Sequence, residues 1–235
     1  MLILKFNFIK RSTWAKYHSG IDQGKVVEFA KEIKTNGFAN SQIEIDDKWE
    51  PHYGDFAFDT KKFPNAKDMV SHLKSEGFRT TLWVYPFVNK DSEVFHKENK
   101  HFIKDKNGTV LVSSWWNGVG AHVDFTDKEA QNWFVSRLEH IRNSTGIDSF
   151  KFDAGELGWV NHDFLFHDKT IQQTPSLLSK VYAETVSRLG ILPISLKAII
   201  LLTFFRKYDR NEGRLRCTTF ADFCPNARQT VSLGL

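Results

Sequence analysis

The sequence has few of the residues on which several classes of functional site depend. Two of its 235 residues are cysteines, and the spacing of Cys217 and Cys224 fits no zinc-binding pattern. It contains no glycine-rich phosphate-binding loop, no dinucleotide-binding fingerprint and no Ser-His-Asp arrangement. The isolated pair Gly118-x-Gly120 is too short to identify a nucleotide site. We therefore expect neither a cofactor nor a bound metal ion.

Long apolar runs are scarce as well. The apolar N-terminal segment is interrupted by Lys5 and Asn7 and is followed by no small-residue cleavage site, so we do not interpret it as a signal peptide. The run 191–205 contains Lys197 and is shorter than the roughly 20 residues of a membrane-spanning helix. We expect this run to form a buried strand or strand pair, and we expect no membrane segment.

Charge of one sign is not concentrated anywhere in the chain. The 32 basic residues exceed the 28 acidic residues only slightly and are scattered, whereas a nucleic-acid-binding surface needs a basic patch or stripe. Aromatic residues are abundant, with 21 Phe, 7 Trp and 5 Tyr, and core packing accounts for most of them. Tryptophan beside polar residues also stacks on the apolar face of a sugar ring. The composition predicts a globular protein that does not bind nucleic acid.

Four segments repeat one plan, in which an amphipathic helix is followed by a glycine and then by an apolar strand. Strands that alternate with helices predict βαβ units and a parallel sheet. A terminal glycine supplies the left-handed turn that other residues resist. The first three expected strands are 42–46, 80–85 and 149–153. The expected helices cover 23–36 and 67–76, a segment that begins at the capping box Thr126-x-x-Glu129 and ends before Gly146, and a segment from Thr174-Pro175 to Gly190.

One long piece, 87–125, interrupts this plan between the second and third helices. We expect a short strand at 109–113 within it. An excursion of this kind either carries function or is a tolerated insertion.

Each expected strand ends on polar residues. Asp46 and Asp47 follow the first strand, Tyr85 the second and Asp153 the third. Ligands bind outside the carboxyl ends of parallel strands, so we expect these residues to meet on one face. The alternative is that such an acid caps a helix or faces water. For Asp153 no helix begins directly afterwards, and Lys151 shares its strand face, where a cation keeps a nucleophilic carboxylate ionised.

A cluster of two histidines and two aspartates, NHDFLFHD at 161–168, has the residue types of a metal site. Its spacing matches no standard set of metal ligands. We expect a solvated loop there.

Three motifs together resemble glycoside hydrolase family 31. They are IEIDDKWEPHYGDFAFD at 43–59, WWNGVGAHVDFTD at 115–127 and KFDAGE at 151–156, and the likeness extends over 12–190. The resemblance implies a (β/α)8 TIM barrel, of which this chain holds about the first half. It also implies that a small carbohydrate or glycoconjugate, an α-galactoside or an α-glucoside, is hydrolysed with retention of configuration. The flanking segments, 1–11 and the divergent tail 191–235, lie outside the likeness.

The resemblance also implies roles for individual residues. Asp153 corresponds to the catalytic nucleophile and Lys151 lies beside it. Asp46 or Asp47, with Asp47 favoured, corresponds to a substrate-binding aspartate. Two tryptophans, Trp83 and Trp116, correspond to walls of the sugar site, and Asp124 to a structural position.

The second carboxyl group of a retaining mechanism is harder to place. The candidate acid/base is Asp209, in a segment RKYDR that resembles the family's approach to that residue. No arginine stands where the family's sugar-binding arginine is expected, and the later barrel strands are mostly absent. Two alternatives therefore stay open: a truncated, inactive fragment with a carbohydrate-binding or regulatory role, and a metal-dependent lyase or isomerase barrel. The resemblance implies a secretory-pathway or extracellular location, which the triplets Asn107-Gly-Thr109 and Asn143-Ser-Thr145 permit.

Overall fold

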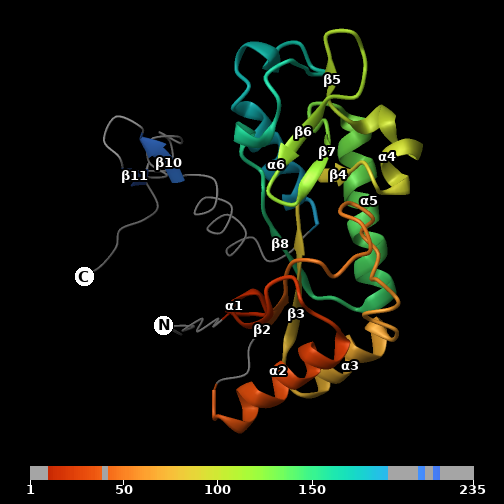
Figure 1. Ribbon diagram of the computed structural model, residues 1–235, viewed down its shortest axis with the longest axis vertical. Helices are drawn as coiled ribbons and strands as arrows, with labels where there is room; N and C mark the ends of the chain where they lie inside the picture. Colours follow the sequence, from red (N-terminus) through yellow and green to blue (C-terminus); the bar gives the residue numbers. More distant parts are fainter. Residues whose placement is uncertain (1–9, 39–41, 190–205, 210–213, 218–235) are drawn as a thin grey trace, which may run out of the picture. The chain divides into compact units, whose positions relative to one another are not determined.

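The computed structural model of the protein describes residues 10–38, 42–189, 206–209 and 214–217. The chain divides into two compact units, 1–189 and 190–235. The described strands are β1 (Lys10–Ser12), β2 (Gln42–Ile45), β3 (Arg79–Val84), β4 (Phe87–Asn89), β5 (Lys104–Asp105), β6 (Val112–Trp115), β7 (Gly118–His122), β8 (Ser149–Phe152), β9 (Phe164–Leu165), β10 (Arg206–Asp209) and β11 (Arg214–Cys217). The described α-helices are α1 (Trp14–Tyr17), α2 (Gln23–Thr35), α3 (Ala66–Ser75), α4 (Glu93–Lys97), α5 (Lys128–Thr145) and α6 (Leu177–Ser187) (Figure 1).

The main sheet of the first unit consists of four parallel strands in the order β1-β2-β3-β8. Helices connect the strands, as a parallel sheet requires, and α3 packs against α2, α5 and strand β3 (Figure 1). The predicted parallel α/β architecture is confirmed. Within the described residues the sheet stays open at both edges and does not close into a barrel.

The strand register separates the sheet into an apolar face and a polar face. Partners in neighbouring strands point to the same side, and successive residues of a strand point to opposite sides. One row of partners is Ile45, Leu82 and Phe150, all buried. The adjacent row is polar and consists of Ser12, Glu44, Thr81 and Ser149. By the same alternation, Asp46, Lys151 and Asp153 belong to the polar face.

Glycines end three of the helices as predicted. Gly37, Gly77 and Gly146 have φ of 70°, 86° and 83°, in the left-handed region that favours glycine. The predicted capping box was wrong. Asp127 is the N-cap of α5 and accepts from the Glu129 N–H, while the Thr126 hydroxyl donates to Asp124.

The excursion after β3 forms a second, antiparallel sheet in the order β4-β7-β6, which Figure 1 shows beyond the end of β3. The strand expected at 109–113 lies instead at Val112–Trp115 and pairs with Gly118–His122. Gly120 allows this sheet to form, since a Cβ there would lie 2.5 Å from the Val88 carbonyl oxygen.

The second unit contributes one described feature, an antiparallel pairing of β10 with β11. The apolar run 191–205, for which we expected buried strands, lies outside the described residues. Within the part of the chain that the structure describes, no helix is long and apolar enough to cross a membrane.

Candidate active site

Asp153 lies at the carboxyl end of β8, with both carboxylate oxygens engaged. Its Oδ2 accepts a 3.0 Å hydrogen bond from the Trp83 indole nitrogen, and its Oδ1 accepts one of 3.0 Å from the Ala154 N–H. The backbone N–H of Asp153 donates to Val84 at 2.8 Å, so the sheet pairing continues up to this residue. The carboxylate is therefore held in one orientation by the neighbouring strand and by the turn that follows it.

Two non-glycine residues in the left-handed region directly follow the strand-end acids. Ala154, after Asp153, has φ of 54°, and Lys48, after Asp47, has φ of 66°. Side chains resist this conformation at a cost of about 1–2 kcal/mol per residue. Strained backbone of this kind clusters at functional sites, because the surrounding structure must hold it in place.

Lys151 forms ion pairs with Glu44 of β2 and with Asp46, the residue after β2. Its Nζ lies 2.8 Å from Oδ2 of Asp46 and 3.1 Å from Oε1 of Glu44. Both acids are buried, at 4% and 3% exposure, and the Ser12 hydroxyl donates to Asp46 at 3.3 Å. We expected Lys151 on the strand face of Asp153 and beside it, and its place in the sugar site stays a prediction. The sequence analysis missed Glu44, which the period-two pattern through Asp46 could have revealed.

Burial and close contact shift the pKa values of Glu44, Asp46 and Lys151 in different directions. Burial and a hydrogen bond with Asp46 raise the pKa of Glu44. Burial also opposes the charge of Asp46, but the hydrogen bond with Glu44 and the Lys151 ammonium outweigh it and lower its pKa. For Lys151 the two carboxylates overcome burial and raise the pKa well above its usual value. The environment therefore favours the protonated form of Glu44 relative to an exposed glutamate, and the charged forms of Asp46 and Lys151.

Asp47 is buried on the same edge and takes its partners from distant segments. Its Oδ1 accepts from the Tyr53 hydroxyl at 2.7 Å and from the Asn117 side-chain amide at 3.4 Å. Burial raises the pKa of Asp47, while the Tyr53 and Asn117 hydrogen bonds act in the opposite direction. Sequence reasoning missed both partners, because no local pattern connects residues 6 and 70 positions away.

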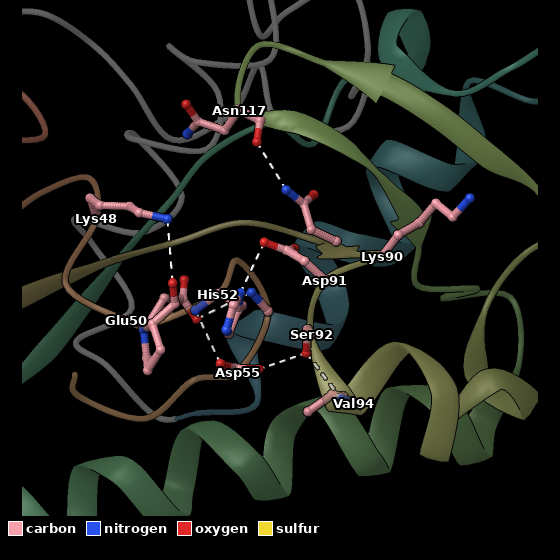
Figure 2. Close-up of polar contacts among 12 residues, drawn as sticks. Lys48, Glu50, His52, Asp55, Lys90, Asp91, Ser92, Val94 and Asn117 are labelled. Atoms are coloured by element: carbon pink, nitrogen blue, oxygen red, sulfur yellow. Dashed lines mark hydrogen bonds and ion pairs between the residues drawn. The ribbon is translucent and has the colours of Figure 1, made fainter. Parts of the chain in front are cut away.

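The segment 50–56 that carries Tyr53 is tied to the loop after β4. The His52 ring lies 2.9 Å from Asp91, and the Ser92 hydroxyl donates to Asp55 at 2.6 Å; Figure 2 shows these pairs facing each other across the two loops. The Tyr53 ring packs against Trp115 with their centroids 5.5 Å apart. These contacts fix the hydroxyl group that reaches Asp47.

Glu50 holds the same segment from the inside. It is 1% exposed, its Oε2 accepts from the N–H groups of Gly54 (3.1 Å) and Phe56 (2.8 Å), and Oε1 bonds the Tyr85 hydroxyl. Burial raises the pKa of Glu50 to about 8, against the opposing effect of these backbone N–H groups. Glu50 therefore closes a loop of seven residues around Tyr53.

The two predicted tryptophans differ in their surroundings. Trp83 is buried and donates to Asp153, whereas Trp116 is 44% exposed and packs edge-on against Trp159 at 5.0 Å. Trp159 comes from the segment that follows Asp153, and its indole nitrogen donates to Glu156. Trp83 therefore contacts Asp153 directly, whereas Trp116 and Trp159 contact each other.

Two further sequence predictions concern Asp209 and the segment 161–168. Asp209 closes β10 in the second unit, and its role stays a prediction. Within the described residues, no group of three or more histidines, cysteines or acids has the geometry of a metal site. In the segment 161–168, the backbone N–H of His167 donates to Asp124 at 2.8 Å, which ties this loop to the turn before α5.

Comparison with known proteins supports one assignment. A family model described as "Glycosyl hydrolases family 31 TIM-barrel domain" matches residues 6–188. The "Myogenesis-regulating glycosidase" of Mus musculus is 41% identical over 206 residues, which is 85% of this chain and 28% of that protein. An "Alpha-xylosidase" of Emericella nidulans is 33% identical over 135 residues, covering 56% of this chain and 17% of that protein.

A solved structure of similar fold extends this comparison. A family 31 α-xylosidase from a soil metagenome, complexed with xylose, has a TM-score of 0.66 at 22% identity. The similarity covers 77% of this chain and 27% of that one. The chain therefore spans less than a third of the length of each of these proteins.

Proposed function

Because the chain belongs to glycoside hydrolase family 31 and carries part of that family's TIM-barrel domain, we propose that it acts on α-glycosides with Asp153 as the nucleophile. One observation carries the proposal: Asp153 directly follows strand β8, and its carboxylate is oriented by hydrogen bonds from Trp83 and Ala154. A nucleophile needs a fixed direction of attack, because reacting atoms must approach to about 3–3.5 Å with their orbitals aligned.

In the first step of the proposed reaction, a carboxylate oxygen of Asp153 attacks the anomeric carbon. A bond forms between that oxygen and the carbon as the bond to the leaving oxygen breaks, and an acid donates a proton to the leaving group. In the second step the same acid, now a base, takes a proton from water, whose oxygen displaces Asp153. The sugar is released with its original anomeric configuration, and we assign the acid/base role to Asp209.

The remaining polar residues supply binding groups for sugar hydroxyls. Asp46 and Asp47 offer acceptors, and Lys151 offers a donor that the neighbouring carboxylates keep charged. Trp83 and Trp116 provide apolar surface against which a sugar ring packs. Negative charge beside the anomeric carbon favours the positively charged transition state of glycosyl transfer.

The experiment uses the purified full chain and aryl α-galactoside, α-glucoside and α-xyloside as substrates. We expect turnover of one of them, and loss of that turnover by at least about a thousandfold in Asp153→Asn. Asp163→Asn, which changes an exposed acid in the loop 161–168, is the matched control. Turnover that persists in Asp153→Asn contradicts the proposed nucleophile, and unchanged turnover in Asp209→Asn contradicts the proposed acid/base.

A second candidate function is carbohydrate binding without catalysis. It is favoured by the exposed ring of Trp116, which packs against Trp159 and offers apolar surface to a sugar ring without requiring a catalytic acid. This candidate predicts that galactose, glucose or xylose binds in calorimetry, that Asp47→Asn weakens the binding, and that no aryl glycoside is hydrolysed.

A further inference from the structure

Asn89, at the end of β4, contacts both Tyr53 and Asn117, the two residues whose side chains donate to Asp47. It is 6% exposed, and all of its polar groups are engaged. Its backbone N–H donates to the Tyr53 carbonyl at 2.8 Å, its Oδ1 accepts from the Trp115 indole nitrogen at 2.8 Å, and its Nδ2 donates to the Asn117 carbonyl at 2.9 Å. The last contact is drawn in Figure 2, where a dashed line ends on the backbone oxygen of Asn117.

The partners of the side chain fix the orientation of its amide. An indole N–H only donates and a carbonyl oxygen only accepts, so the Asn89 oxygen must face Trp115 and its nitrogen must face Asn117. Aspartate or leucine has a similar outline but cannot satisfy both partners. The Asn89 side chain is therefore specified by chemistry as well as by size.

The hairpin is shaped to receive this side chain. Trp115 pairs with Gly118, so β6 and β7 are joined by the two-residue turn Trp116-Asn117. A Cβ on Gly118 would lie 2.8 Å from Nδ2 of Asn89, and one on Gly120 would lie 2.7 Å from its Oδ1. Any larger residue at these positions would displace the amide.

Both side chains that donate to Asp47 belong to residues whose backbone Asn89 holds. Asn89 bonds the Asn117 carbonyl, and the Asn117 amide donates to Asp47; Asn89 bonds the Tyr53 carbonyl, and the Tyr53 hydroxyl donates to the same oxygen. We propose that Asn89 is a positioning residue for Asp47. It acts indirectly, because its side chain fixes the turn that carries Asn117, and the Asn117 amide donates to Asp47. This inference rests on the proposed function in one respect, namely that Asp47 binds a sugar hydroxyl.

The test measures the pKa of Asp47 by carboxyl NMR in the isotopically labelled full chain, with Asp47→Asn to identify the resonance. Asn117→Ala removes a donor to the carboxylate, so the pKa of Asp47 is expected to rise. Asn89→Ala is expected to raise it in the same direction. The double variant Asn89→Ala/Asn117→Ala is expected to add nothing further, because both changes act through one hydrogen bond.

Trp115→Phe is the matched control, since it removes the indole donor to Asn89 but keeps an aromatic ring against Tyr53 and leaves the Asn117 contact in place. It is expected to lower stability without moving the pKa of Asp47. A folded Asn89→Ala with the wild-type Asp47 pKa overturns the proposal, and so does a Trp115→Phe that shifts this pKa as far as Asn89→Ala. The charges nearest Asp47, those of Asp46 and Lys48, are the same in all of these variants.

A second variant covers the case in which Asn89→Ala does not fold. If Asn89→Ala does not fold, Asn89→Ser replaces it, because the serine hydroxyl keeps a polar group beside Trp115 but is too short to reach the Asn117 carbonyl. The measurement needs no substrate and no turnover. Failure of the glycoside assays would therefore overturn the proposed function without deciding the role of Asn89.

Discussion

Trp83 and Asp153 meet across the neighbouring strands β3 and β8, where the indole nitrogen donates a 3.0 Å hydrogen bond to Oδ2 of the carboxylate. Trp83 is 2% exposed and cannot turn away without opening the core. An indole nitrogen can only donate, so this contact fixes one oxygen of the proposed nucleophile. The orientation of Asp153 is thus decided by a residue 70 positions earlier in the chain.

Replacement of Trp83 tests this contact. Trp83→Phe keeps an aromatic ring but removes the donor, and we expect the free energy of unfolding to fall by about 1–3 kcal/mol, because a half-buried carboxylate loses a hydrogen bond. Urea denaturation measures the change. Trp14→Phe, at an exposed position of α1, is the control and is expected to change stability by less than about 0.5 kcal/mol. Equal effects of the two substitutions would contradict the prediction.

Lys151 is expected to matter for stability as well as for binding. Lys151→Met leaves Glu44 and Asp46 without their cation, and we expect a loss of about 3 kcal/mol at pH 7, since removing one partner of a buried pair leaves a charge uncompensated. The control Lys180→Met removes an exposed helical pair and is expected to have little effect.

The loss in Lys151→Met is also expected to depend on pH. Asp46 has a lowered pKa in the folded protein, so its contribution is present above its ordinary value of 3.8 and is lost as the pH falls through the folded value. The difference between Lys151→Met and the wild type should therefore shrink below about pH 4. A difference that is constant from pH 7 to about pH 2 would show that lost packing, and not lost charge, causes it.

Glu50 provides a second pH-dependent prediction. Its pKa is raised from 4.5 to about 8 by burial, so its contribution to stability is fully present below pH 4.5 and is lost as the pH rises through about 8. Glu50→Gln mimics the protonated carboxyl, because the amide oxygen accepts from the backbone and the amide nitrogen donates to Tyr85. Relative to wild type, this variant should gain up to about 1.4 kcal/mol per pH unit between pH 5 and 8.

Denaturation at pH 5.5 and pH 8 measures that difference. Glu139→Gln, at a half-buried position on α5, is the control and should keep the wild-type pH dependence. If Glu50→Gln follows the same pH dependence as the wild type, Glu50 is already ionised in the folded protein at pH 5.5.

Gly120 is expected to tolerate no side chain. Gly120→Ala places a Cβ within 2.5 Å of the Val88 carbonyl oxygen, which is part of the backbone and cannot rotate away, so we expect a loss of about 1–3 kcal/mol. Gly158→Ala is the matched control, since nothing lies within 4 Å of its added Cβ. Thermal unfolding compares the two, and a Gly120→Ala protein as stable as Gly158→Ala would disprove the close approach.

Local sequence patterns predicted most of the main sheet. The strand predicted at 42–46 differs from the observed Gln42–Ile45 by one residue, because the apolar residues Ile43 and Ile45 alternate with polar ones in the sequence. Prediction failed where the chain had two local options. Thr126 and Asp127 both have side chains suited to an N-cap. Asp127 caps the helix, and the Thr126 hydroxyl donates a hydrogen bond to Asp124 instead. The hairpin of β6 and β7 was only partly predicted, because two glycines in β7 weaken the strand pattern.

The sequence by itself determined that acids stand at the ends of apolar strands and that glycines end the helices, because both depend on neighbours within a few positions. It also carried the motifs that identify the family. Only the tertiary structure decided which groups these acids meet: Lys151 with Glu44 and Asp46, Trp83 with Asp153, and Asn117 with Asp47. The physical reason is that strand register and loop position bring together residues about 70 to 107 places apart, and hydrogen bonds form only within about 3.5 Å.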